Sequence, residues 1–405
     1  MNKYIFIIGI ILFPLSFGGA DSHAANGKEH LQPVYHLLLA RHLLPKPVYK
    51  DSANIPELTG GWYGAMGEHP VKKVSIANPA YPDGIDDDDG NHYSLNVDLY
   101  LPADMTGKRP TVFFIAGWHV YHSETYRSLL YFIASQGFNC VYVPYHHPDP
   151  TNNPDLLLNI LDRVVADFAP IIDTTRIGYM GHSEGGGLAF YLAKDRPQWG
   201  TNGRFIFSLA AWWGFNLPAT GNVDYPSNTN MIVQMYNPDY DTGTDPRQNI
   251  DFLLHNNIPA KRKTYLYLPG DADHISDHGV SYSDVAANGE YIYDALEQVG
   301  IYRPLESLMR YSFENDTQWK KIGLPDDGDE NYNVEYQIQM PGNDITVLST
   351  DTPLQNTNVP IPAEAALDAN YLCHQHDPNG YYNPRWQMCM PCGDTDRDAN
   401  WEQCQ

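Results

Sequence analysis

The sequence predicts an α/β fold, in which a mainly parallel sheet carries helices on both faces. Two observations lead to this prediction. Between about residues 60 and 310, short apolar runs typical of buried strands alternate with longer amphipathic runs typical of helices. A glycine-rich turn from Gly181 to Gly185, with the order Gly-His-Ser-Glu-Gly, lies between such a strand and such a helix. The chain of 405 residues is long enough for one large domain and an appendage.

The predicted elements follow one another in regular order along this region. Strands are expected at Tyr93–Leu101, Thr111–Ile115, Asn139–Pro144, Ile177–Met180, Phe205–Ala211, Met231–Tyr236 and Thr264–Leu268. Helices are expected at Tyr126–Ser135, Leu156–Phe168, directly after Ser183, and at Tyr291–Val299. Parallel strands need such crossovers, and the active residues of these sheets gather at the carboxyl ends of the strands.

The first 24 residues have the features of a secretory signal peptide. Lys3 precedes an apolar run from Tyr4 to Phe17, and small residues follow that run. The run is short for a transmembrane helix. We therefore expect a secreted or periplasmic protein, with residues 25–312 as its α/β domain.

The charge of the chain excludes some classes of partner. The formal net charge is −24, from 49 acidic and 25 basic residues. Such a surface repels nucleic acid and anionic membranes. We expect a soluble monomer with no nucleic-acid partner and no membrane anchor.

Residues 313–405 are expected to form a small β-rich, cysteine-rich appendage. Alternating apolar residues at Asn333–Met340, a turn at Pro341–Asp344 and the run Ile345–Leu348 are typical of a hairpin.

Four of the five cysteines lie in this last stretch, at Cys373, Cys389, Cys392 and Cys404. In an exported protein they should form two disulfides, and the sequence leaves their pairing open. A zinc site at Cys389 and Cys392, with His374 and His376 nearby, is the alternative. Cys140 lies in an apolar strand pattern and is expected to be a buried thiol.

Ser183 is the candidate nucleophile. A serine on a tight strand-to-helix turn is raised above the sheet, and small neighbours let the backbone bend sharply. The amino terminus of the following helix also favours an anion forming there.

A serine hydroxyl needs a base to activate it and an acid to orient that base. The expected chain order for this kind of turn is serine, acid, histidine. Asp241 and, as a close second, Asp239 follow the strand that ends at Tyr236, and His274 follows the next strand. An alternative uses Asp273 as the acid and His374 or His376 as the base.

The same reasoning supplies candidates for the rest of the site. The backbone N–H groups of Trp118 and Glu184 are expected to form an oxyanion hole. Trp212, Trp213 and His119 follow strand ends and could contact a substrate.

The region from about 60 to 310 resembles an α/β-hydrolase. Within that superfamily it is similar to the dienelactone-hydrolase, cutinase and polyester-hydrolase branch. The resemblance rests on the Ser183 turn, on an aromatic residue after Gly117, and on the sequence Ala210-Ala211-Trp212. It implies a triad of Ser183, Asp241 and His274. Polyester hydrolases usually carry methionine where this chain has Glu184.

The resulting expectation is a serine hydrolase that cleaves small-molecule or polymeric carboxylic esters without a cofactor or a metal. A polyester hydrolase, a serine peptidase and a non-catalytic binding protein on the same fold are the alternatives. Acidic runs at Asp86–Asp89 and Asp394–Asp398 lack full EF-hand spacing and are expected to be solvated loops rather than calcium sites. The sequence does not indicate the acyl or alcohol group, or the role of the appendage.

Overall fold

A computed structural model describes most of the region between residues 43 and 324. The described residues are 43–50, 64–86, 90–146, 152–212, 217, 223–237, 252–253, 256–269, 276–324, 346–348, 381–383 and 388–390. The expected signal peptide therefore lies outside them.

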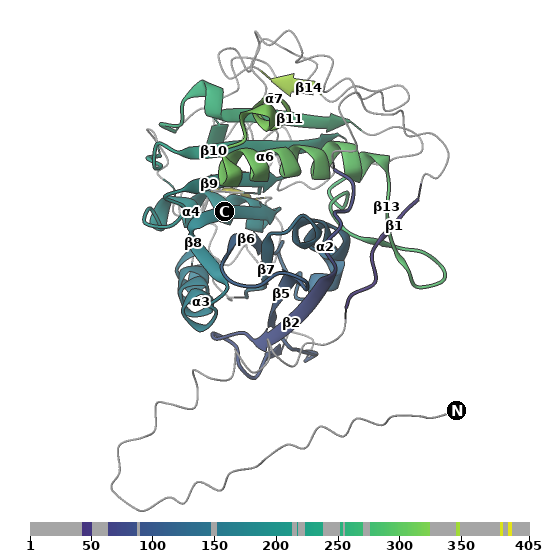
Figure 1. Cartoon of the computed structure of the whole chain (residues 1–405). Helices are drawn as coiled ribbons and strands as arrows, with labels where there is room; N and C mark the ends of the chain where they lie inside the picture. The colour runs from purple at the N-terminus through teal and green to yellow at the C-terminus, as the bar shows by residue number, and fades with distance from the viewer. Residues whose placement is uncertain are drawn as a thin grey trace, which may run out of the picture.

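A large mixed sheet, mostly parallel, forms the centre of the molecule (Figure 1). Nine strands of the described residues compose it, in the order β14-β11-β10-β9-β8-β6-β7-β5-β2. Their bounds are β2 Val71–Ala77, β5 Asn96–Pro102, β6 Arg109–Ile115, β7 Asn139–Val143, β8 Ile172–His182, β9 Gly203–Leu209, β10 Thr229–Asn237, β11 Lys263–Pro269 and β14 Thr346–Leu348. Strands β6 to β11 pair in parallel, whereas β2, β5 and β14 pair antiparallel to their neighbours. The predicted α/β class is thus confirmed.

Helices cover both faces of this sheet, as alternate residues of β9 show. Arg204 and Ser208 hydrogen-bond to carbonyl oxygens of α4, whereas the ring of Phe205 packs on Phe313 of α6. Successive strand residues point to opposite faces, so α4 and α6 lie on opposite sides of the sheet. The helices are α2 Arg127–Ser135, α3 Asn153–Asp167, α4 Glu184–Asp195, α6 Arg303–Glu314 and α7 Lys320–Gly323.

Each pair of helices on a face is held together by side-chain contacts. Arg310 of α6 donates to Gln136 at the end of α2, at 3.0 Å, and both helices lie on the same side in Figure 1. On the other face, Tyr191 of α4 donates to Asp155 of α3 at 3.1 Å. Between the layers, Cys140 of β7 is fully buried, and burial raises the pKa of its thiol.

The expected helix at Tyr291–Val299 is wrong in its first part. Residues Tyr291–Tyr293 form the strand β13, which pairs with β1 Val48–Tyr49 and β12 Asp284–Val285 in a small second sheet. The helix cannot begin earlier because the Asp294 carboxylate accepts the N–H groups of Leu296 and Glu297. A π-helical segment, η5 Glu297–Tyr302, then leads into α6.

Helix α6 runs through residue 312, where the sequence predicts a domain boundary. The ring of Phe313 lies 5.5 Å from that of Phe138 and 5.2 Å from that of Phe205. Strand β14 pairs with β11. Its expected hairpin partner, Asn333–Met340, lies outside the described residues.

Little of the predicted appendage belongs to the described residues. Strands β15 Tyr381–Asn383 and β16 Met388–Met390 form an antiparallel pair. Cys389 lies in β16, whereas Cys373, Cys392 and Cys404 lie outside the described residues, as do His374, His376 and the run Asp394–Asp398.

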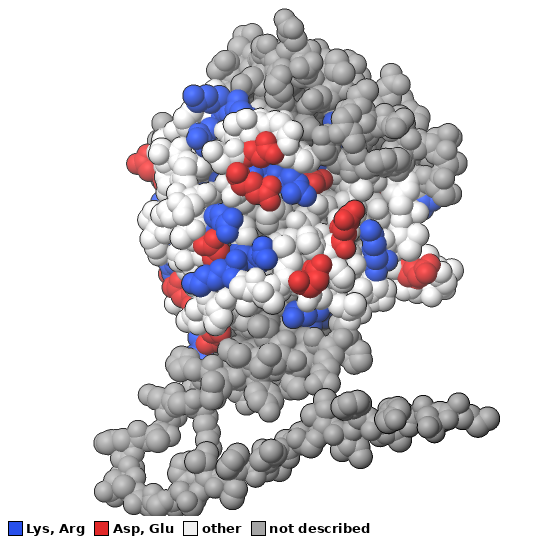
Figure 2. All heavy atoms as spheres, viewed as in Figure 1, with Lys and Arg blue, Asp and Glu red and all other residues white. Residues whose placement is uncertain are grey.

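The described surface mixes charges of both signs. Figure 2 shows acidic and basic side chains next to one another on the face drawn. Ion pairs at the surface include Arg196 with Asp162, at 2.7 Å, and Arg310 with Glu314, at 3.5 Å. No helix among the described residues is long and apolar enough to span a membrane.

Candidate functional site

Ser183 lies on the turn between β8, which ends at His182, and α4, which begins at Glu184. Its backbone has φ 57° and ψ −124°, a conformation that residues other than glycine rarely adopt. Three backbone hydrogen bonds hold this conformation. The N–H of Ser183 donates to the Leu209 carbonyl at 2.9 Å, and its own carbonyl accepts from Trp212 at 2.9 Å and Gly187 at 3.2 Å. The side chain is mostly buried, with 9 % of the residue exposed.

Lack of space for a side chain explains why glycines flank Ser183. A Cβ on Gly181 would lie 2.1 Å from the Gly185 carbonyl oxygen. A Cβ on Gly185 would lie 2.2 Å from the carbonyl oxygen of Ala116, at the end of β6. Strand and helix approach so closely at this turn that neither position has room for a side chain.

Glu184 begins helix α4 and is 1 % exposed. Its Oε1 accepts a hydrogen bond of 2.8 Å from Asn153, the first residue of α3. A carboxylate in the first turn of a helix is also favoured by the helix dipole. The Glu184 side chain therefore lies in the interior. Burial of the nearby Tyr145 phenol, and next the charge of Glu184, raise the pKa of that phenol.

The structure brings the oxyanion candidate Trp118 together with two of the candidate substrate residues, Trp212 and His119, and the Trp212 N–H bonds to the Ser183 carbonyl. The rings of Trp118 and Trp212 lie 5.2 Å apart in a T-shaped arrangement, and His119 lies 5.0 Å from Trp118. These residues come from the loops after β6 and β9, which both leave the carboxyl edge of the sheet. His119 is exposed with φ 55°, so its backbone is in the left-handed region.

This aromatic group continues through residues that the sequence did not single out as site residues. His146, which follows β7, lies 5.6 Å from His119, and its Nδ1 is 3.1 Å from the Tyr121 hydroxyl. The ring of Tyr93 lies 5.0 Å from that of Tyr121. The loops at this edge thus present a row of rings that starts next to Ser183.

A buried polar group around His182, which directly precedes Ser183 in the chain, was also missed. His182 is fully buried and contacts Tyr126 and residue 278 through hydrogen bonds of 3.0 and 2.8 Å. The rings of His182 and His278 are 4.5 Å apart. Burial, and next the neighbouring His278, lower the pKa of the His182 imidazole well below its usual value. The sole sequence signal was the position of His182 before the serine.

Asp241, His274 and Trp213 lie outside the described residues, as do the alternatives Asp239 and Asp273. The strands that precede them are described. Asn237 pairs in register with Pro269, so β10 and β11 end together at the edge to which β8 also runs. The chain is described again from Ser276, whose hydroxyl donates to the Leu268 carbonyl at 2.7 Å.

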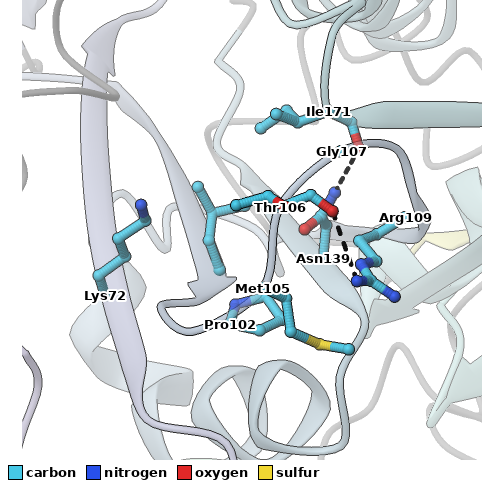
Figure 3. Close-up of a pocket in the computed structure, with 9 residues that line it drawn as sticks. Lys72, Pro102, Met105, Thr106, Gly107, Arg109, Asn139 and Ile171 are labelled. Atoms are coloured by element: carbon cyan, nitrogen blue, oxygen red, sulfur yellow. Dashed lines mark hydrogen bonds between the residues drawn. The ribbon is translucent and has the colours of Figure 1, made fainter.

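A cavity of about 230 Å³ lies at the opposite edge of the sheet. It is lined by residues at the amino ends of β6 and β7, including Arg109 and Asn139 (Figure 3). Asn139 donates to the Ile171 carbonyl at 2.9 Å, so its amide is engaged in the wall. Because Ser183 follows the carboxyl end of β8, this cavity is not part of the candidate site.

Among the described residues, no three His, Cys, Asp or Glu side chains gather closely enough to hold a metal ion. Asp86 of β3 Ile85–Asp86 instead contacts His92 of β4 His92–Tyr93, at 2.8 Å. Comparisons of the chain with protein-family models and with curated proteins found no match.

Proposed function

We propose that the protein is a serine hydrolase that cleaves carboxylic esters, with Ser183 as its nucleophile. The strained backbone of Ser183 carries this proposal. Such strain costs on the order of 1–3 kcal/mol and persists where the surrounding structure imposes it, most often at functional sites. Here Gly181 and Gly185 make the close approach possible, and helix α4 directs its amino terminus at the turn.

The order of the elements supports the finer proposal of an α/β-hydrolase fold. In that fold the second oxyanion donor comes from the loop between the third strand and the next helix. Strand β6 is third along the chain among the strands of the large sheet, and α2 follows it. Gly117 and Trp118 lie in the connecting loop.

The proposed reaction follows from these positions. Ser183 Oγ attacks the ester carbonyl carbon while His274 accepts the hydroxyl proton and Asp241 orients the imidazole. The N–H groups of Trp118 and Glu184 stabilise the resulting oxyanion. The carbon–oxygen bond to the alcohol breaks, His274 returns the proton to that alcohol, and water then hydrolyses the acyl-enzyme.

Small or polymeric esters are the proposed substrates, bound against Trp118, Trp212 and His119, with Trp213 as a further candidate. The enzyme would act without a cofactor, as a secreted or periplasmic monomer. This setting rests on the signal-peptide pattern and on the acidic composition of the chain.

A fluorophosphonate probe tests the nucleophile directly, because it bonds covalently to an activated serine. The wild-type protein should be labelled, Ser183→Ala should not, and Ser75→Ala, on the exposed side of β2, should be labelled normally. Absence of labelling in the wild type would favour a binding protein and reject the proposal.

An assay with matched p-nitrophenyl ester and p-nitroanilide substrates separates an esterase from a peptidase. We expect turnover of the ester to exceed turnover of the anilide. Faster hydrolysis of the anilide would instead support the peptidase alternative.

A further inference from the structure

Three segments that are distant in the sequence meet at the imidazole of His182. Its Nδ1 lies 3.0 Å from the hydroxyl of Tyr126, which is 56 residues away. Its Nε2 lies 2.8 Å from the carbonyl oxygen of His278, which is 96 residues away. The Tyr126 hydroxyl oxygen also accepts the backbone N–H of Gly117, at 3.2 Å.

The chemistry of these partners sets the direction of every hydrogen bond. A carbonyl oxygen can only accept, so His182 Nε2 carries a hydrogen and donates it to residue 278. In the neutral ring Nδ1 is then an acceptor, and the single hydroxyl hydrogen of Tyr126 must point to it. The Tyr126 oxygen keeps its lone pairs for Gly117. A fully buried histidine with a strongly lowered pKa remains in this neutral form.

The chain of hydrogen bonds joins the parts that the proposed reaction needs. Gly117 directly precedes Trp118, the proposed oxyanion donor. His182 directly precedes Ser183. Residue 278 lies four positions after His274, the proposed base.

The segment after His274 is anchored at its other end as well. The N–H of Ser283 donates to the Thr125 carbonyl at 2.6 Å, and the Ser283 hydroxyl accepts from Ser128 at 2.7 Å. Thr125 and Ser128 flank Tyr126, so the same short stretch of chain holds this segment and bonds to His182.

We propose that His182 is a positioning residue, which with Tyr126 fixes Gly117, next to the proposed oxyanion donor, and residue 278, which follows the proposed base, relative to Ser183. This inference rests on the proposed function. Displacement of a reacting group by about 1 Å can lower a rate about 100-fold, so small shifts of these loops should be measurable as activity.

The substitution Tyr126→Phe tests the inference, because it removes the bridging hydroxyl and keeps the ring. Tyr142→Phe is its matched control. Tyr142 is equally buried, its ring lies 6.2 Å from that of Tyr126, and its hydroxyl donates to the Val120 carbonyl at 2.7 Å. Each variant thus loses one phenol hydrogen bond to the loop after β6. Tyr126→Phe also loses the hydrogen bond between the phenol and His182 Nδ1.

We expect Tyr126→Phe to lower kcat for a p-nitrophenyl ester by about 10- to 100-fold, with KM within about twofold of wild type. Fluorophosphonate labelling of Ser183 should slow in parallel. Tyr142→Phe should keep kcat within about twofold. Thermal unfolding should shift further in Tyr126→Phe, which loses two buried hydrogen bonds, than in Tyr142→Phe, which loses one. In ¹⁵N NMR spectra, the Nδ1 resonance of His182 should move in Tyr126→Phe alone.

Equal kcat values for the two variants, or wild-type kcat in Tyr126→Phe, would overturn the positioning role. If Ser183→Ala is then still inactive, the proposed function stands without this inference. Absence of wild-type labelling would reject the proposed function, and the positioning role with it.

Discussion

The unusual conformation of Ser183 depends on its two glycine neighbours. Gly185 lies against the carbonyl oxygens of Ile115 and Ala116, at the end of β6. Any side chain there must push α4 away from the sheet, and with it the serine. The glycine spacing is therefore a steric requirement of the turn, which explains why the sequence indicates it so clearly.

Gly185→Ala should move the serine. Its Cβ would lie 2.2 Å from backbone, so we expect loss of about 1–3 kcal/mol of stability and a large drop in fluorophosphonate labelling. Gly186→Ala is the milder comparison, since its nearest contact would be 2.9 Å, to the Leu209 carbonyl oxygen. Urea unfolding and labelling rates measure both effects. A larger effect at Gly186 would contradict the steric argument.

Lys263 at the start of β11 makes stability depend on pH. Burial lowers the pKa of its amine from 10.5 to about 8. Between these values the unfolded chain binds more protons than the folded one, so this group makes stability rise with pH. Below about pH 8 the Lys263 amine is charged in both the folded and the unfolded state, so the full cost of burying this charge lowers the free energy of unfolding.

The substitution Lys263→Met should therefore stabilise the protein at pH 7, and the gain should shrink by about 1–2 kcal/mol at pH 9.5. The amine donates to Asn256 Oδ1 at 3.2 Å, and that oxygen retains the Ile258 N–H at 2.9 Å in the variant. Urea unfolding of both proteins at the two pH values checks this. A difference independent of pH would refute it.

At the scale of elements, helix α4 is anchored at its carboxyl end by a side chain from β9. Arg204 is fully buried and donates to the carbonyl oxygens of Ala193, Arg196 and Pro197, at 2.7, 2.9 and 2.9 Å. These oxygens belong to the end of the helix and the turn after it, where carbonyls lack partners within the helix. The arginine thus joins the helix that begins at the candidate site to its neighbouring strand.

Arg204→Met should cost about 2–4 kcal/mol of stability, because three carbonyls, that of Ala193 fully buried, lose a charged donor. Arg176→Met in β8 is the control. That arginine is partly exposed and pairs with Asp173 at 2.7 Å, and this carboxylate keeps its hydrogen bonds from Thr175, so loss of the arginine should cost at most about 1 kcal/mol. Equal losses of stability in urea unfolding would contradict the anchoring role of Arg204.

At the scale of the whole molecule, helix α6 continues past the expected domain boundary at residue 312 and packs against the sheet. Phe313 packs on Phe138, which precedes β7, and on Phe205 of β9. Gly203 allows the close approach, since a Cβ there would lie 2.3 Å from the Ser312 carbonyl oxygen. The residues just after 312 are therefore part of the core of the α/β region.

Phe313→Ala should destabilise the α/β region by about 3–5 kcal/mol, because it leaves a cavity between two elements. Glu314→Ala, at the exposed end of the helix, should change stability by at most about 0.5 kcal/mol. Thermal unfolding and esterase activity after heating measure the difference. Unchanged unfolding in Phe313→Ala would instead support a boundary at residue 312.

Local pattern was a good guide to individual elements. The apolar runs predict β6, β7 and β11 to within two residues at each end, because buried parallel strands are apolar throughout. The pattern failed at Tyr291–Val299, where Ile292 and Tyr293 pair with β1 and the Asp294 carboxylate caps the helix that follows. Local sequence cannot show which neighbour a short apolar segment will find.

The candidate site likewise contains residues that local sequence predicts and residues that it does not. Ser183, Trp118 and Trp212 were predicted as site residues because strand ends and glycine turns have local signals. Tyr126 and His182 carry no comparable signal, since a buried polar contact depends on partners far away in the chain.

The order of residues by itself determined the alternation of strands and helices and the sharp turn at Ser183, because hydrophobic period and glycine sterics act over a few neighbouring positions. Tertiary structure alone decided that β6 lies between β7 and β8, that α6 covers residue 312, and that Tyr126, His182 and residue 278 meet. Those outcomes depend on how whole surfaces pack and on which acceptors the buried donors reach. The local pattern of residues specifies neither the packing nor the partners.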